Sequence, residues 1–255
     1  MQDLFSRAVI DADQRVQYGA DPNQFGELRL PRSQGPFPAV VVIHGGFWRA
    51  STDLRHMGHM CVALVVDGIA TFNVEYRRVG NAGGGWPGTL DDIRAAAKFL
   101  GARAPRYNID PKRIVVVGHS AGGQLALWLA AEKALPLRGV VSLAGIADLR
   151  RAHELKLGNG AVAEFLGGGP DKVEARFKQA SPLERLPLKS PVRLVHGIDD
   201  KVVPLEIAKR YEAAARAARD DARLTPLPGT GHFELIDPLA AQFRMVNAAI
   251  RGLLL

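Results

Sequence analysis

Apolar and polar positions along the chain form two alternating patterns. Short apolar runs rich in Val, Ile and Ala are typical of strands buried on both faces of a parallel sheet. Between them, apolar residues recur every three or four positions, which indicates amphipathic helices. The predicted strands are 39–44, 69–76, 114–117, 139–144, 192–196 and 222–227, and the predicted helices are 51–68, 90–103, 121–131, 204–219 and 238–253. This order predicts an α/β fold with a mostly parallel central sheet, flanked by helices and connected by right-handed crossovers.

Three segments refine this picture. The stretch FGELRL at 25–30 predicts an antiparallel edge strand. End signals predict that the helix at 51–68 starts at Ser51 or Thr52, and that the last helix has Asp237 as its cap and Pro238 in its first turn. Residues 148–188 have no strand pattern and contain three short helical stretches. Because they lie between two core strands, we expect a small helical cap insertion over a binding site.

Composition limits the possible classes of protein. The chain has 255 residues, 47% of them hydrophobic, which predicts a single domain over 1–255. No apolar stretch is long enough to span a membrane, and charged residues near the start do not fit a signal peptide, so we expect a cytoplasmic protein without a membrane partner. Cys61, the single cysteine, falls on the apolar face of a predicted helix and is predicted to be a core residue.

Charge gives no sign of a nucleic-acid partner. The net charge is +7, but arginines occur from one end of the chain to the other and alternate with acidic residues. Basic runs with interleaved aromatic residues, which are typical of nucleic-acid binding, are missing from the sequence. We therefore expect an ordinary solvated surface and no nucleic-acid partner.

Candidate chemistry begins at Ser120. It stands in GHSAGG, between the predicted strand at 114–117 and the helix at 121–131. A GxSxG motif in this context predicts a sharp turn that exposes the serine hydroxyl above the carboxyl ends of the strands. The backbone N–H of Ala121 then becomes a donor for an oxyanion, and Gly46 and Phe47, at the end of the strand at 39–44, are the candidates for the other donors.

A serine nucleophile needs a base and an acid that orients the base. His232 follows the last predicted strand in a glycine-bracketed loop, so it is the predicted base. The acid is Asp199 or Asp200, because adjacent residues cannot both face His232. The other histidines have other predicted roles: His196 is a core residue, His119 braces the turn, and the pair His56 and His59 lacks a third ligand with the spacing of a zinc site.

These motifs resemble the α/β-hydrolase superfamily, from about residue 25 to the end. More narrowly, HGGFW, VEYRR, WPGTLDDI, GHSAGGQLA and HGIDDKVVP resemble the bacterial esterase/lipase group that includes feruloyl-esterase-like proteins and kynurenine formamidases. The resemblance selects Asp200 as the acid and implies that Tyr76, Arg77 and Asp92 are structural supports. Phe47 stands where the HGGG form of the motif has its third glycine, which favours formamidase-type enzymes.

The resemblance implies a serine esterase that cleaves small carboxylic esters through an acyl-enzyme, with no metal and no organic cofactor. An arylformamidase or amidase with the same triad is the alternative. A catalytically silent protein that binds a small ligand is an alternative of another class. Trp48 and Trp86 are candidate substrate-binding residues, although packing within their loops would explain them equally well. A homodimer is compatible with the sequence.

Overall fold

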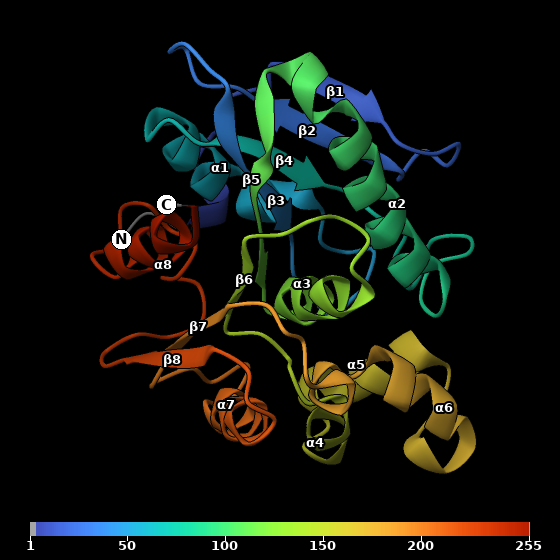
Figure 1. Cartoon of the computed structure of the whole chain (residues 1–255). Helices are drawn as coiled ribbons and strands as arrows, with labels where there is room; N and C mark the ends of the chain where they lie inside the picture. Colours follow the sequence, from blue (N-terminus) through green and yellow to red (C-terminus); the bar gives the residue numbers. More distant parts are fainter. Residues whose placement is uncertain (1–3, 255) are drawn as a thin grey trace.

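A computed structural model describes residues 4–254 of the chain. Its strands form one eight-stranded sheet in the order β1-β2-β4-β3-β5-β6-β7-β8 (Figure 1). β1 and β2 are antiparallel to their neighbours, whereas the six strands β3 to β8 run parallel to one another. The strands are β1 Gln14–Gln17, β2 Phe25–Arg29, β3 Phe37–Ile43, β4 Ala70–Val74, β5 Ile109–His119, β6 Gly139–Leu143, β7 Val192–Gly197 and β8 Ala222–Leu227.

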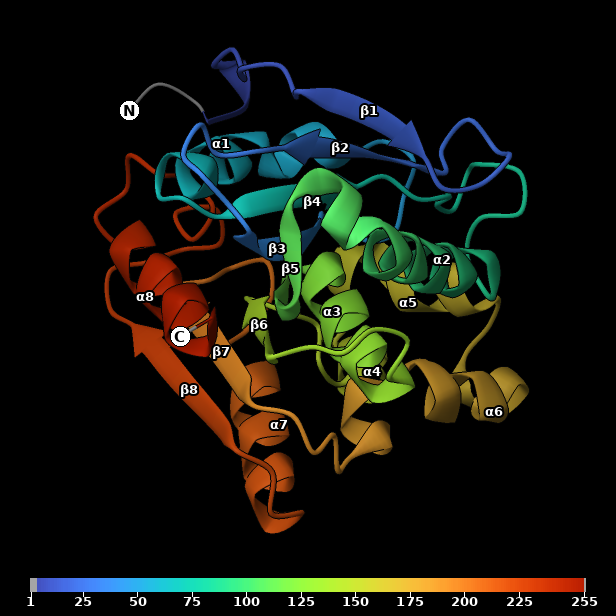
Figure 2. The same ribbon diagram turned by 45° about the horizontal axis from the view of Figure 1, so that its top comes forward.

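Helices cover both faces of this sheet. The α-helices are α1 Gly58–Val66, α2 Gly88–Arg103, α3 Ala121–Glu132, α4 Leu149–Glu154, α5 Leu157–Leu166, α6 Pro170–Ala180, α7 Glu206–Ala217 and α8 Phe243–Leu254. The 3₁₀ turns are η1 Leu4–Ser6, η2 Leu54–Met57, η3 Ala104–Tyr107 and η4 Pro182–Arg185. Figures 1 and 2 show α1 and α8 on one face, and α2, α3 and α7 on the other.

Alternation along the central strands divides the apolar core in two. In β3, Val40 and Val42 point toward α1 and α8, while Val41 and Ile43 belong to the cluster that α2, α3 and α7 cover. The neighbouring strand β5 alternates in the same way, with Val115 and Val117 on the α1 side. Burial on both sides explains why these strands appear in the sequence as unbroken apolar runs.

Several predicted boundaries are wrong. The edge strand is β1, and β2, which was predicted to lie at the edge, is the second strand. Neither Ser51 nor Thr52 starts the helix: Asp53 caps η2, where its carboxylate accepts from the N–H of Arg55 at 2.9 Å, and α1 follows. The last helix starts at Phe243, five residues after Pro238, because the chain first forms two turns, in which the N–H of Ala240 donates to the carbonyl of Asp237 and the N–H of Phe243 to that of Ala240. Asp237 caps a turn instead and forms an ion pair with Arg7.

Other predictions of the fold agree with the structure. β8 covers the predicted residues 222–227, and Cys61 is fully buried. The segment 148–188 contains α4, α5, α6 and η4, which pack beside one another. Over residues 4–254, no helix combines the length and the apolar character needed to cross a bilayer.

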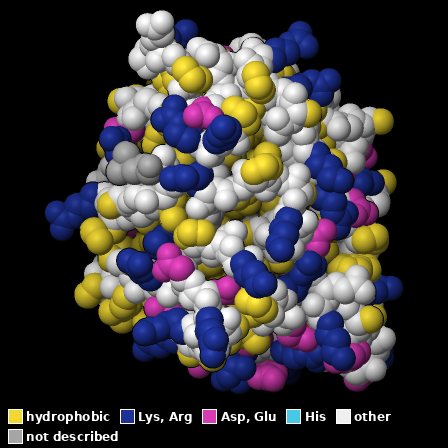
Figure 3. Space-filling view, in the orientation of Figure 1, with side chains coloured by type: hydrophobic (Ala, Val, Ile, Leu, Met, Phe, Trp, Pro, Cys, Tyr) yellow, Lys and Arg dark blue, Asp and Glu magenta, His cyan; other side chains and the backbone are white. Residues whose placement is uncertain are grey.

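Basic side chains do not gather into one patch on the face shown in Figure 3. Lys and Arg are spread over this face, with acidic and apolar side chains between them. Many of the arginines form ion pairs with neighbouring carboxylates, such as Arg150 with Glu174 and Glu184. The positive net charge of the chain is therefore distributed over this surface.

Candidate active site

Ser120 occupies a strained turn between β5 and α3. Its backbone has φ 57° and ψ −122°, a region that residues other than glycine rarely adopt. The turn also requires Gly122, because a Cβ on this residue would lie 2.2 Å from the carbonyl oxygen of Ile43 in β3. The serine is therefore held at the carboxyl edge of the sheet, where it lines a large cavity. This is the placement that GHSAGG predicts.

His232 and Asp200 meet at the same edge of the sheet. The Nδ1 atom of His232 lies 2.6 Å from Oδ2 of Asp200, and both side chains are almost completely buried. Oδ1 of Asp200 accepts from the N–H groups of Val202 and Val203 at 2.8 and 2.9 Å. Burial opposes the charge of this carboxyl group, but the hydrogen bonds from His232 and from the two backbone groups hold the Asp200 pKa below its usual value. Asp199, the alternative acid, is exposed.

The loop that carries His232 is attached to the turn that carries Ser120. His119, directly before the serine, has Nε2 2.9 Å from the carbonyl oxygen of His232, and the two rings are 4.5 Å apart. Ser120 and His232 line the same cavity. Among the described residues, the Ser120 hydroxyl makes no hydrogen bond, and bonds of this kind often tighten only when substrate binds.

His119 is part of a chain of hydrogen bonds that links His56 to the loop of His232. A carbonyl oxygen can only accept, so Nε2 of neutral His119 carries the proton and its Nδ1 accepts from Nε2 of His56, 2.7 Å away. Burial lowers the pKa of His56 to about 3 and holds the pKa of His119 well below its usual value. Burial also lowers the pKa of His196, whose Nε2 donates to the carbonyl of Val203 at 2.8 Å. The histidines around His232 therefore stay neutral near pH 7.

The loop after β3 approaches the serine closely. A Cβ on Gly45 would lie 2.9 Å from Cβ of Ser120, so only glycine fits there. The next three residues all have positive φ: 98° at Gly46, 53° at Phe47 and 57° at Trp48. Among the described residues, the N–H groups of Gly46 and Phe47 donate to no backbone carbonyl. These donors, together with the N–H of Ala121 at the start of α3, are the candidates for an oxyanion hole.

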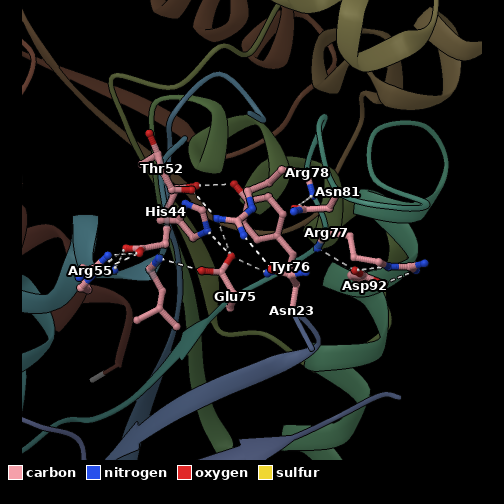
Figure 4. A network of polar contacts seen from close by, with 12 residues as sticks. Asn23, His44, Thr52, Arg55, Glu75, Tyr76, Arg77, Arg78, Asn81 and Asp92 are labelled. Atoms are coloured by element: carbon pink, nitrogen blue, oxygen red, sulfur yellow. Dashed lines mark hydrogen bonds and ion pairs between the residues drawn. The ribbon is translucent and has the colours of Figure 1, made fainter. Parts of the chain in front are cut away.

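A buried polar network supports this loop (Figure 4). Glu75 accepts from Nε2 of His44 at 3.0 Å and from the N–H of Leu54 at 3.0 Å, and it forms an ion pair with Arg78 at 3.1 Å. Tyr76 donates its hydroxyl to the carbonyl of His44 at 2.9 Å. Burial opposes the charge of Glu75, but the hydrogen bond from His44, the charge of Arg78 and the N–H of Tyr76 keep the Glu75 pKa below its usual value.

The roles of Glu75 and Arg78 were not predicted. Arg78 donates to the carbonyl of Thr52 and to Asn23, and so connects three loops. The signal that could have revealed Glu75 is its place at the end of an apolar strand pattern, where a carboxylate must be paired if it is buried. Next to this network, Arg77 forms the ion pair with Asp92 at 2.7 Å that its predicted structural role requires.

The residues that follow Gly46 are fixed to helix α5. The indole of Trp48 is fully buried, stacks on Phe165 at 4.7 Å and donates to Oε1 of Gln124 at 2.9 Å. Arg49 bonds both carboxylate oxygens of Glu164, at 2.7 and 2.8 Å. The strained conformation of the loop is therefore held from outside by α5, which lies within the 148–188 insertion.

The structure places both tryptophans, the candidate substrate-binding residues, outside the wall of the large cavity. Trp48 lies outside the wall of the large cavity because its ring is enclosed between Phe165 and Gln124. Trp86 is half-buried on the edge of the core and lines a separate small cavity of about 170 Å³, beside Trp128 and Arg94. Both rings therefore pack against neighbouring helices: Trp48 against α5 and α3, and Trp86 beside α2 and α3.

The large cavity has a volume of about 1400 Å³. Ser120, His232, Gly46 and Phe47 line one part of it, and residues of the N-terminal segment line another. Among the described residues of its wall, none comes from 148–188, the predicted cap. Over residues 4–254, no group of three or more His, Cys, Asp or Glu side chains is arranged to hold a metal ion.

Comparisons with known proteins agree with the geometry. A family model described as BD-FAE matches residues 27–214. Esterase LipC of Mycobacterium tuberculosis is 27% identical over 247 residues, which cover 88% of this chain but only 60% of LipC. Kynurenine formamidase avaC of Aspergillus versicolor is 30% identical over 214 residues, which cover 68% of this chain and 73% of the formamidase.

Comparison with solved structures addresses the fold. A structure described as a truncated form of carbohydrate esterase from gut microbiota has a TM-score of 0.81 with this chain, at 22% sequence identity, and the match covers 96% of both chains. This similarity and the order of the strands confirm the predicted α/β-hydrolase fold.

Proposed function

Because the chain belongs to the BD-FAE family, we propose that it is a serine esterase that hydrolyses small carboxylic esters through an acyl-enzyme intermediate. The observation that carries this proposal is the 2.6 Å hydrogen bond between His232 and Asp200, formed at the edge of the cavity that Ser120 also lines. Nucleophilic acyl transfer requires an imidazole oriented by a carboxylate and an accessible serine, and here both line one cavity.

In the first half of the reaction, Oγ of Ser120 attacks the carbonyl carbon of the ester while His232 takes the hydroxyl proton. The carbonyl oxygen becomes an oxyanion, which the N–H groups of Gly46, Phe47 and Ala121 stabilise. When the tetrahedral intermediate collapses, the bond to the alcohol oxygen breaks and His232 returns the proton to it. Asp200 keeps the proton of Nδ1 in place and stabilises the imidazolium.

In the second half, water takes the place of the alcohol. His232 removes a proton from the water, which attacks the acyl carbon. When the second tetrahedral intermediate collapses, the bond to Oγ of Ser120 breaks, His232 returns the proton to Oγ, and the carboxylic acid is released. The neutral histidines near His232 suit this cycle, because no second positive charge opposes formation of the imidazolium.

A second candidate function is hydrolysis of an aryl formamide. It is favoured by the 30% identity with kynurenine formamidase avaC, and the same triad would serve both reactions. Turnover of a short-chain p-nitrophenyl ester and of N-formylkynurenine, measured side by side, separates the two: the esterase proposal requires the larger kcat/KM for the ester.

The direct test is the variant Ser120→Ala. If the serine is the nucleophile, kcat with p-nitrophenyl acetate falls by about 10⁶-fold, as in other serine hydrolases. Ser51→Ala is a matched control, since Ser51 lines the same cavity, and it should keep its activity. Unchanged turnover in Ser120→Ala would end the proposal.

A further inference from the structure

The N-terminal segment forms part of the wall of the active-site cavity. The wall includes Leu4, Phe5 and residues 7–11, all of which lie outside the stretch that the family model matches. Figure 2 shows this dark-blue segment beside α1 before the chain enters β1. Arg7 anchors it through the ion pair with Asp237 at 2.6 Å, and the carbonyl of Ile10 accepts from Arg29 at 3.0 Å. The segment is therefore fixed in place next to the site.

Two aromatic rings of this wall pack on each other, and one of them contacts the imidazole of His232. Phe233 directly follows His232, and the two rings are 5.0 Å apart in an edge-to-face arrangement. Phe5 packs edge-to-face on Phe233 at 5.4 Å and also contacts the ring of His56 at 5.6 Å. Even so, Phe5 is 51% exposed and Phe233 is 41% exposed. An exposed apolar surface of this kind inside a cavity is typical of a binding site.

The arginines of the cavity wall are already paired with carboxylates. Among the described residues, the wall carries five arginines, and each already forms an ion pair: Arg7 with Asp237, Arg15 and Arg29 with Glu27, Arg55 with Asp53, and Arg78 with Glu75. An anionic substrate would have to displace these partners. The surface that Phe5 and Phe233 offer is therefore best matched by an apolar group.

The proposed mechanism determines which portion of the ester lies next to Phe233 and Phe5. His232 returns its proton to the alcohol oxygen, so the alcohol portion lies beside the imidazole during the reaction. The oxygen of the acyl carbonyl instead faces the donors at Gly46 and Phe47. The residues that flank the imidazole, Phe233 and then Phe5, are therefore neighbours of the alcohol portion.

We propose that Phe5 and Phe233 form a subsite for the alcohol portion of the ester and select substrates in which this portion is apolar. The inference rests on the proposed esterase function and adds a specificity-determining residue from the N-terminal segment. Contact with half-exposed phenyl rings favours a long or cyclic alkyl alcohol over methanol, because each buried CH₂ group contributes to transition-state binding.

The experiment compares two series of substrates. One varies the alcohol, from methyl acetate to hexyl acetate, and the other varies the acid, from methyl acetate to methyl hexanoate, with kcat/KM measured by pH-stat titration. In Phe5→Ala, the ratio of hexyl acetate to methyl acetate should fall by about five- to tenfold, while the ratio of methyl hexanoate to methyl acetate stays constant. Phe233→Ala should behave in the same way, and Phe5→Leu should restore most of the preference.

Leu239→Ala is the matched control, because Leu239 is 79% exposed and lies outside the cavity wall. It should change neither ratio. Unchanged ratios in both Phe5→Ala and Phe233→Ala, or an equal fall of both ratios, would overturn the inference. Failure of the esterase proposal would give a different result. The wild-type protein would then hydrolyse no ester in either series, which would contradict both proposals.

Discussion

Replacing Asp200 by asparagine tests the hydrogen-bond arrangement of the site. Oδ1 of Asp200 accepts from the N–H groups of Val202 and Val203, so the asparagine must keep its carbonyl oxygen at this position. Its amide NH₂ group then faces Nδ1 of His232. Since NH₂ can only donate, Nδ1 must accept, and the neutral imidazole carries its proton on Nε2. In this tautomer His232 cannot take the proton of Ser120.

The expected loss is large although the change in volume is small. The wrong tautomer costs about 10⁴-fold in kcat in enzymes with this triad, which corresponds to about 5 kcal/mol of transition-state stabilisation. KM should change little, because Asp200 lies behind the imidazole and is absent from the cavity wall among the described residues. The assay is steady-state hydrolysis of p-nitrophenyl acetate, with thermal unfolding to verify that the variant is folded.

Asp199→Asn provides the matched control, because Asp199 is adjacent in sequence but exposed. It should keep its activity within about twofold. The reasoning would be refuted if Asp200→Asn kept kcat within tenfold of the wild-type value, or if Asp199→Asn lost as much activity as Asp200→Asn.

Three further predictions concern stability and packing. The folded pKa values of His56, His119 and His196 lie below the unfolded value near 6.5, so the unfolded state binds more protons as the pH falls. The free energy of unfolding, measured with urea, should therefore fall by about 1–2 kcal/mol or more between pH 7.5 and pH 5. A constant free energy of unfolding over this range would contradict this prediction. Gly122→Ala should abolish or severely destabilise the fold, whereas Gly252→Ala, in open space on α8, should gain about 0.5–1 kcal/mol by chemical denaturation. Trp48→Phe should lower kcat and stability with little change in KM, since the indole holds the loop; a selective rise in KM would instead place this ring against the substrate.

The sequence allowed the core of the fold to be predicted because its signals are local. The strands from β3 to β7 are largely buried on both faces, so each appears as an apolar run, and the glycines around Ser120 mark the sharp turn. Strand β1 was missed for the opposite reason: it has four residues, mostly exposed, and no apolar pattern.

Contacts between distant segments could not be predicted in the same way. The predicted positions of Ser120, His232 and Asp200 depended on the order of strands in a parallel sheet, which brings loops at the carboxyl edge together. The partners of Glu75 and the burial of Trp48 depend on side-chain directions that have no local signature. The part that the N-terminal segment plays in the cavity wall was missed because it depends on a long-range ion pair, Arg7 with Asp237.

The most direct measurement of the central claim is covalent trapping of the nucleophile by a fluorophosphonate, followed by peptide mass spectrometry. The account predicts one phosphonyl group, on the peptide that contains Ser120, with labelling lost in Ser120→Ala and strongly slowed in His232→Ala. Modification of another residue at the same rate, or labelling that does not depend on His232, would contradict it.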